Sequence, residues 1–218
     1  MHDIDHNQKH FAQDYAKVRS WKVKDSKCIS LLDVIENVHP TILIGVSTQA
    51  GAFTQEMIQL MAKHVKHPII FPLSNPTSRS EARPADLIKW TKGKAIIATG
   101  SPFDPVAYRG KLYQIAQCNN VYIFPGVGLA LIATKARIAS DSIFIEAAKI
   151  LSKHSPMLKD PNGALFPTLD TLRSVTREIG IGVSQLIFKE GHARIPMPDS
   201  IEKLIDQKIW FPDYPSYA

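Results

Sequence analysis

The chain has 218 residues, of which 44% are hydrophobic and 21% charged, and these proportions are ordinary for a soluble globular protein. Its net charge is +6, but the lysines and arginines are scattered and no aromatic residues alternate with them, which argues against nucleic-acid binding. No stretch reaches the roughly 18 apolar residues that span a bilayer, so we expect no membrane segment. Cys28 and Cys118 match no metal or redox spacing and are typical of reduced thiols in a cytoplasmic protein.

Residues 1–29 are predicted to form an N-terminal tail. His2, His6 and His10 are spaced four residues apart, so a helix would place them on one face, where they could hold a metal ion. No apolar positions anchor such a helix, which favours a solvated, frayed segment instead. The tail also lacks the apolar core of a secretory signal.

The segment SLLDVIENV at 30–38 predicts the first helix. Ser30 and Asp33 form a pair like a capping box, in which the side chain of each residue accepts the backbone N–H of the other. His39 and Pro40 end the helix, because a residue that precedes proline avoids the helical conformation.

Short apolar runs further along the chain predict buried strands. They are rich in β-branched or aromatic residues and do not alternate with polar residues, which suits a parallel sheet covered on both faces. The runs are TILIGV at 41–46, PIIFPL at 68–73, AIIATG at 95–100 and NVYIFPGV at 120–127. Helices are predicted between them, with Thr54 as N-cap of one and Pro84 at the first position of another. The alternation indicates βαβ units.

The pattern becomes helical after about residue 128. The expected elements are helices at 128–140, 141–154 and 168–190, separated by a loop rich in proline and glycine at 155–167. Gly191 suits the end of the last helix, and the aromatic segment 209–218 is expected to dock as an extended tail. The sequence thus predicts an α/β fold: a partial Rossmann-like domain at 30–127, then a helical region at 128–218.

Polar or glycine-rich residues stand at the expected ends of these strands. The segments read GVSTQAGAF, PLSNPTSR, ATGSPFDP and, just ahead of the last run, QCNN. Each could be a plain turn, since Ser, Asn, Gly and Pro are turn residues. In an open parallel sheet, however, ligands bind outside the carboxyl ends of the strands, and small polar residues permit close backbone approach to a dinucleotide.

Other catalytic patterns are missing from the sequence. GVSTQAG is not the GxGxxG fingerprint of a pyrophosphate loop, because Ser47 stands where the second glycine would be. No Ser/His/Asp set, Cys/His pair or pair of carboxylates can be placed. Asp104, Asp141 and Glu146 are interpreted as a turn residue, a helix cap and a helix surface residue.

Several motifs together resemble the second half of malic enzyme, the malate dehydrogenase that also decarboxylates. They include SNPTSR, ATGSPFDPV, CNNVYIFPGVGLA, LLDVIENVHPTILIGVS and SDSIFIEAAKIL, in the same order as in that family. The likeness runs from about residue 30 to the end, and LSNPTSR and IAQCNN are most similar to the bacterial NAD-type branch. The resemblance implies the C-terminal half of a Rossmann-like NAD-binding domain.

The resemblance also implies roles for particular residues. Asn75 and either Asn119 or Asn120 would contact malate and the nicotinamide end of NAD. A neutral amide can donate to a carboxylate without adding a competing base, and such orientation contributes several kcal/mol toward the barrier. The implied cofactor-facing positions also include Gly45, Ser47, Gly100 and Ser101.

The reaction implied by the resemblance is the oxidative decarboxylation of (S)-malate to pyruvate and CO2, with NAD and Mg²⁺ or Mn²⁺. The family's catalytic Tyr and Lys, its metal ligands and its pyrophosphate loop belong to parts that precede the matched segment. No catalytic or metal-binding residue is therefore assigned here, and the chain is expected to be inactive alone. NADP stays open, because the acidic residue that contacts the ribose belongs to the unmatched half.

Two other interpretations remain. One is a non-catalytic module that keeps the NAD-domain fold and complements another subunit. The other, disfavoured by the scattered charge, is a nucleic-acid binder. Expected partners are a second copy of the chain or a complementary N-terminal half, because the partial sheet would have an open edge.

Overall fold

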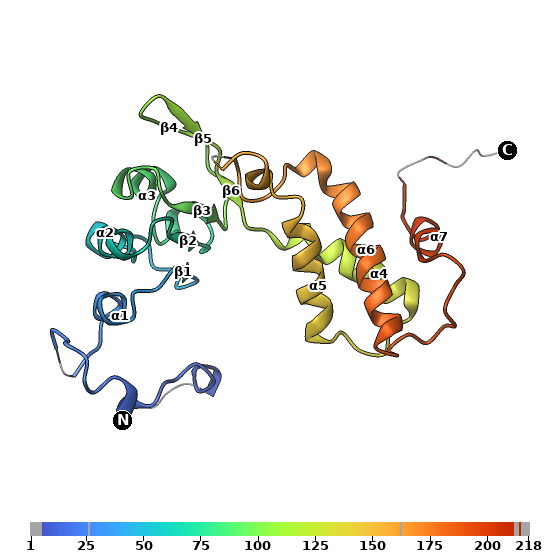
Figure 1. Cartoon of the computed structure of the whole chain (residues 1–218), viewed down its shortest axis with the longest axis horizontal. Coiled ribbons are helices and arrows are strands. Elements are labelled where there is room, and N and C mark those ends of the chain that lie inside the picture. The colour runs from blue at the N-terminus through green and yellow to red at the C-terminus, as the bar shows by residue number, and fades with distance from the viewer. Residues whose placement is uncertain (1–5, 26, 162, 212–213, 215–218) are drawn as a thin grey trace.

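The computed structural model describes residues 6–25, 27–161, 163–211 and 214. Figure 1 shows two lobes, one built on a β-sheet and the other on helices, which meet near strand β6. The sheet lobe carries the N-terminal segment, and the helical lobe carries the C-terminal segment. This arrangement agrees with the predicted α/β sheet region followed by helices, although the exact division at residue 128 stays a prediction.

The sheet has four parallel strands in the order β1-β2-β3-β6. They are β1 (Ile42–Gly45), β2 (Ile69–Pro72), β3 (Ile96–Thr99) and β6 (Ala116–Gln117). Leu43 lies opposite Ile70, which in turn lies opposite Ile97, so the apolar residues are in register. A separate antiparallel hairpin, β4 (Val106–Tyr108) and β5 (Lys111–Tyr113), projects beside the sheet (Figure 1).

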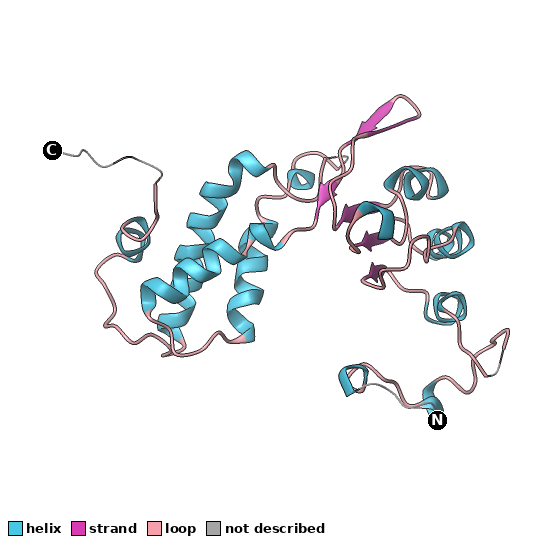
Figure 2. Cartoon of the chain, turned by 180° about the vertical axis from the view of Figure 1, so that it is seen from behind, coloured by secondary structure: helices cyan, strands magenta, loops and turns pink. Residues whose placement is uncertain are grey.

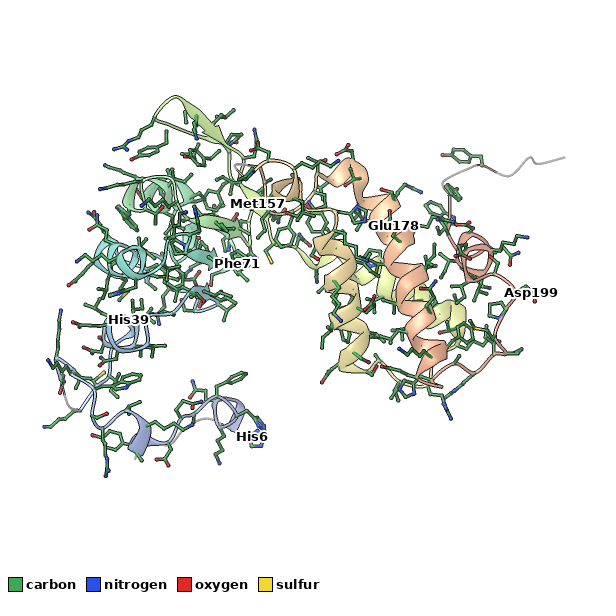
Figure 3. All side chains as sticks on the ribbon, viewed as in Figure 1. His6, His39, Phe71, Met157, Glu178 and Asp199 are labelled. Carbon is green, nitrogen blue, oxygen red and sulfur yellow. The ribbon has the colours of Figure 1, made fainter. Side chains whose placement is uncertain are left out.

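Three helices cover one face of this sheet (Figures 1 and 2). They are α1 (Leu31–Val38), α2 (Gln55–His64) and α3 (Pro84–Trp90). The core of this lobe joins strand residues to helix residues: Leu43, Ile70, Ile97, Ile35, Ile58, Met61, Leu87 and Ile88. The capping box of Ser30 and Asp33, the Thr54 cap and the position of Pro84 are all confirmed.

The opposite face of β1 is uncovered by the described elements. Ile42 and Ile44 point away from the helices and are 50% and 56% exposed. In the described part of the chain β1 also pairs with a strand on one side alone. Parallel sheets are normally covered on both faces, whereas the described residues leave this face of β1 accessible.

The prediction of a strand at 120–127 is wrong. Asn120–Tyr122 form a 3-10 turn (η4), and α4 begins at Phe124, with Pro125 in its first turn. Proline has no N–H to give to a sheet but fits the first turn of a helix. A short apolar run alone cannot distinguish a strand from a buried helix. The fourth strand is instead the two-residue β6, just upstream.

The helical lobe packs around the longest helix, α6. The helices are α4 (Phe124–Thr134), α5 (Asp141–Ser152), α6 (Leu172–Lys189) and α7 (Ile201–Asp206), with short 3-10 turns η5 (Pro156–Leu158) and η6 (Leu169–Thr171). Val175, Ile179, Val183 and Ile187 recur at helical spacing along α6 and are fully buried in the core of this lobe. Gly191 follows this helix in the left-handed conformation that glycine favours.

Differences from the expected helix bounds are local. The helix expected at 128–140 begins four residues earlier and ends at Thr134, where Lys135 takes a left-handed cap conformation. Ser140, rather than Asp141, occupies the N-cap position of α5. The helix expected to start at residue 168 begins as the turn η6.

The two ends of the chain are largely exposed. The N-terminal tail contains two short 3-10 turns, η1 (His6–Gln8) and η2 (Tyr15–Lys17), and its described residues are mostly exposed, as predicted for a solvated segment. His2 lies outside the described residues. Trp210 and Tyr214 are 75% and 94% exposed, so the prediction of a docked aromatic tail is wrong for them. No helix in the described ranges is both long and apolar enough to cross a membrane.

Two glycines of α4 give a matched test of the helical lobe. A Cβ on Gly126 would lie 2.7 Å from the Cβ of Ile179 in α6, whereas one on Gly128 would meet no atom within 4 Å. We expect Gly126→Ala to destabilise the fold by about 1–3 kcal/mol through overpacking. Gly128→Ala should be neutral or stabilising by up to about 1 kcal/mol, since alanine favours helix. Urea unfolding measures both, and equal stabilities would contradict the packing described here.

Candidate functional site

The candidate site is the set of loops that follow the four parallel strands, which we name the carboxyl edge. It comprises residues 46–53, 73–80, 100–105 and 118–120, after β1, β2, β3 and β6. Because the strands are parallel, these loops emerge at the same edge of the sheet. All of the sequence-predicted site residues lie in these loops or, for Gly45, at the last position of β1.

A buried carboxylate, Glu81, joins the first two loops of the carboxyl edge. The amide and the hydroxyl of Ser47 donate to its Oε1 at 2.7 and 2.8 Å. From the other loop, the Ser74 hydroxyl donates to Oε1 at 2.6 Å and the Ser74 amide to Oε2 at 3.3 Å. The ends of β1 and β2 are therefore held together through one acidic side chain.

A second group of hydrogen bonds joins the ends of β2, β3 and β6. The Ser101 hydroxyl donates to the side-chain oxygen of Asn75, so these two predicted site residues are in direct contact. The Thr99 hydroxyl donates to the backbone carbonyl of Ser101 at 2.8 Å, and the side-chain amide of Gln117 donates to the backbone carbonyl of Gly100 at 3.0 Å. The orientation of Asn75 is thus set by residues of the neighbouring strand.

The two glycines predicted to face the cofactor are required by packing. A Cβ on Gly45 would lie 2.6 Å from Glu81 Cδ and 2.7 Å from Phe53 Cζ, and one on Gly100 would overlap the carbonyl oxygen of Leu73. The missing side chains let neighbouring parts of the carboxyl edge approach closely. Both glycines shape the backbone of the site.

Asn119 and Asn120 stand apart from Asn75. Asn119 accepts the amide of Val121 at 2.9 Å and so caps the η4 turn, while Asn120 is exposed as the first residue of that turn. Within the described ranges, no hydrogen bond joins either residue to Asn75. The structure places all three at the same edge, and their ligand contacts stay a prediction.

Glu81 is a site residue that the sequence reasoning missed. It is 0% exposed, although a glutamate just before a helix is normally exposed. Burial acts to raise the pKa of Glu81, but hydrogen bonds from Ser74 and Ser47 outweigh it, so the pKa lies below its ordinary value. The carboxylate is therefore ionised at neutral pH. Its environment of serines at two strand ends gives no recognisable sequence signal.

A groove of about 730 Å³ lies at the carboxyl edge, between the loops that follow β2 and β3. Its walls include Thr77, Ser78, Arg83, Phe103 and Asp104. This volume is in the range that small ligands occupy in proteins. Asn75 and Ser101 do not line this groove, but its wall residues Thr77 and Pro102 follow them within two positions in the chain.

The residues present fit one part of a dinucleotide and fit a metal poorly. Uncharged amides and hydroxyls at the ends of parallel strands suit a nicotinamide and a small carboxylate. The sequence has no GxGxxG loop to hold the pyrophosphate. In the ranges that the structure describes, no group of three or more His, Cys, Asp or Glu side chains could hold a metal ion, and His6 and His10 form no such group.

Burial raises the pKa of the Cys118 thiol, which follows β6. A thiol with a raised pKa is a weak nucleophile at neutral pH.

A parallel sheet with these polar loops at its carboxyl edge defines a segment of a Rossmann-like dinucleotide-binding domain. Residues 1–188 match the family profile described as malic enzyme, NAD binding domain. The chain belongs to this family, as the motifs around Asn75 and Asn119 indicated.

Relatives and solved structures agree with this assignment. The chain is 46% identical over 210 residues to the NAD-dependent malic enzyme of Enterobacter sp. (strain 638) and 45% identical to that of Shewanella loihica. Each match covers 96% of this chain, and the chain spans 37% of those relatives' length. The fold matches the Entamoeba histolytica malic enzyme with a TM-score of 0.67 at 22% identity, covering 95% of this chain and 40% of that one.

The close approach at Gly100 generates a stability prediction for the site. Gly100→Ala should destabilise the fold by about 1–3 kcal/mol, because the backbone carbonyl of Leu73 cannot move away without disturbing the end of β2. Urea unfolding monitored by circular dichroism measures the effect. Gly128→Ala, the same chemical change in open space, serves as control, and an unchanged midpoint for Gly100→Ala would contradict the geometry.

Proposed function

We propose that this chain supplies the nicotinamide-side edge of an NAD-dependent malic enzyme, which oxidatively decarboxylates (S)-malate to pyruvate and CO2. The family membership supports the oxidoreductase class, and the similar proteins carry the name NAD-dependent malic enzyme. The observation that carries the proposal is the Asn75 side chain, oriented by Ser101 at the carboxyl edge. NADP is the alternative cofactor.

The proposed work of Asn75 is orientation. Because its side-chain oxygen accepts from the Ser101 hydroxyl, its NH₂ group keeps two N–H donors for a ligand. These donors suit the carboxylate of malate or the carboxamide of nicotinamide. Asn119 or Asn120 would supply a second amide from the next strand end, and fixing both reactants lowers the entropic part of the barrier.

We further propose that the chain has no malic enzyme activity by itself. The resemblance assigns the catalytic Tyr and Lys, the ligands of Mg²⁺ or Mn²⁺ and the pyrophosphate loop to other parts of the family. A bound divalent ion would supply polarisation of the malate hydroxyl and carbonyl.

The partner that we propose is a complementary N-terminal half or a second copy of the chain. Its place would be the free edge and the exposed face of β1, where Ile42 and Ile44 are accessible. A strand added to this edge would extend the parallel ladder, and helices would cover the apolar face. The alternative is a non-catalytic, subunit-complementing module with the same fold.

Asn75 gives a test of nicotinamide contact. Asn75→Ala should weaken NAD binding about 3- to 10-fold, the usual effect of losing one neutral hydrogen bond. ADP-ribose, which lacks the nicotinamide, should bind wild type and variant equally. Calorimetry measures both ligands on the chain mixed with an N-terminal half of the Enterobacter relative, because the chain has no GxGxxG loop to hold the pyrophosphate. Equal NAD affinities for the two proteins would remove Asn75 from the nicotinamide contact.

Activity of the isolated chain is tested with malate, NAD and Mn²⁺ by following NADH absorbance. We expect no turnover above the background without protein. The same assay with an added N-terminal half of the Enterobacter relative tests complementation. Turnover by the chain alone would contradict the proposed division, and failure of the mixture would favour the non-catalytic module.

A further inference from the structure

The Glu81 carboxylate is charged, fully buried and without a cation. It is 0% exposed, and among the described residues it forms no ion pair. Burying an unpaired carboxylate costs much free energy unless donors replace the lost water. A glutamate in this position therefore needs a compensating arrangement, and a neutral residue would avoid the cost altogether.

The compensation comes from four donors that belong to just two residues. Ser47 and Ser74 each give a backbone N–H and a hydroxyl to Glu81, at distances from 2.6 to 3.3 Å. An ionised carboxylate accepts at both oxygens and donates nothing, so all four hydrogens can point toward it. Hydrogen bonds to a charged acceptor are also stronger than neutral ones.

The carboxylate fixes the direction of the two hydroxyl hydrogens. Since both hydroxyls donate to Glu81, their oxygens are left as acceptors, and they accept the amides of Thr48 at 2.8 Å and Gln49 at 3.2 Å. Thr48 takes the left-handed conformation, with φ of 57°, which is uncommon for a threonine. The backbone of the loop after β1 is thus held by a series of connected hydrogen bonds that begins at the Glu81 carboxylate.

We propose that Glu81 is a positioning residue for cofactor binding: its buried carboxylate orders the loops after β1 and β2 in the conformation that receives the nicotinamide. This inference rests on the proposed function. Glu81 touches no ligand itself and acts through Ser47, Ser74 and Thr48. The apolar stem of the same side chain packs against Gly45, so the strand end and the loop share one support.

The direction of the shift in the Glu81 pKa determines the pH range in which the ionised carboxylate can order the loops. Hydrogen bonds from the serines hold it below the ordinary value of 4.5, outweighing burial, which acts to raise it. A lowered folded-state pKa contributes stability that is present above the unfolded value and is lost as the pH falls through the folded value. No histidine, lysine, arginine or second carboxyl in the described ranges interacts with the carboxylate. Loop order should therefore be insensitive to pH between 5 and 8.

The test is Glu81→Gln in the 218-residue chain, with amide hydrogen exchange and NAD titration followed by NMR. We expect the amides of Ser47, Thr48 and Ser74 to exchange at least about 10-fold faster and NAD affinity to fall about 10-fold, because charged hydrogen bonds become neutral. Amides of α6 should be unchanged. Glu36→Gln, at an exposed position on α1, is the matched control and should behave as wild type.

A pH profile separates positioning from simple packing. In wild type the amide shifts of Ser47 and Ser74 should follow a common titration below pH 4.5, which should be absent from Glu81→Gln. Ser74→Ala, which keeps the charge but removes the bridge to Thr48, is a second variant and should loosen the same loop.

Unchanged amide exchange at Ser47, Thr48 and Ser74 in both variants would overturn the inference. A variant whose loop amides exchange faster but whose NAD affinity equals that of wild type would overturn it as well. If wild type does not bind NAD even with the added N-terminal half of the Enterobacter relative, the proposed function fails, and the exchange data alone decide whether Glu81 orders the loops.

Discussion

The carboxyl edge depends on the hydrogen bonds that converge on Glu81. Parallel strands bring their ends to one side of the sheet, but they do not determine how the following loops are shaped. In this chain the ionised Glu81 side chain joins the ends of β1 and β2, because Ser47 and Ser74 each donate a backbone N–H and a hydroxyl to it. Gly45 has no side chain because this carboxylate and Phe53 fill the space. The glycine and the glutamate are thus one structural unit.

The neighbouring strand ends use a neutral version of the same arrangement. Ser101 orients Asn75, and Gln117 donates to the carbonyl of Gly100, so β2, β3 and β6 are connected by uncharged groups. A charge is placed where it is fully enclosed, and amides are placed where they can face a ligand. The charged group is thus enclosed behind the ends of β1 and β2, and neutral groups join the remaining strand ends.

Much of the sheet lobe could be predicted from the sequence, because each signal was local. The runs that contain β1, β2 and β3, the capping box at Ser30 and Asp33, and the Thr54 cap all depend on residues within a few positions of one another. The prediction of a strand at 120–127 failed because Tyr122 and Val127 are buried by helix packing rather than in the sheet, and Pro125 suits a helix start. The actual fourth strand has two residues, Ala116 and Gln117, too few for a pattern.

The sequence identified most residues of the candidate site but not the hydrogen bonds that join them. Asn75, Ser101 and the glycines stand out as polar or small residues at strand ends, yet their mutual contacts require the register of the sheet. Glu81 was invisible for a related reason: its partners are 7 and 34 residues away, and a buried glutamate contradicts the usual exposure of that residue.

The uncovered face of β1 and the ordered carboxyl edge have different physical requirements. The edge is stabilised within the chain, through Glu81 and the Asn75–Ser101 contact. The face needs another surface, because isoleucines at 42 and 44 remain about half exposed. A partner on that face would bury apolar area without changing the hydrogen bonds of the edge. The two requirements are therefore separate: hydrogen bonds within the chain order the edge, whereas the face of β1 leaves apolar area accessible.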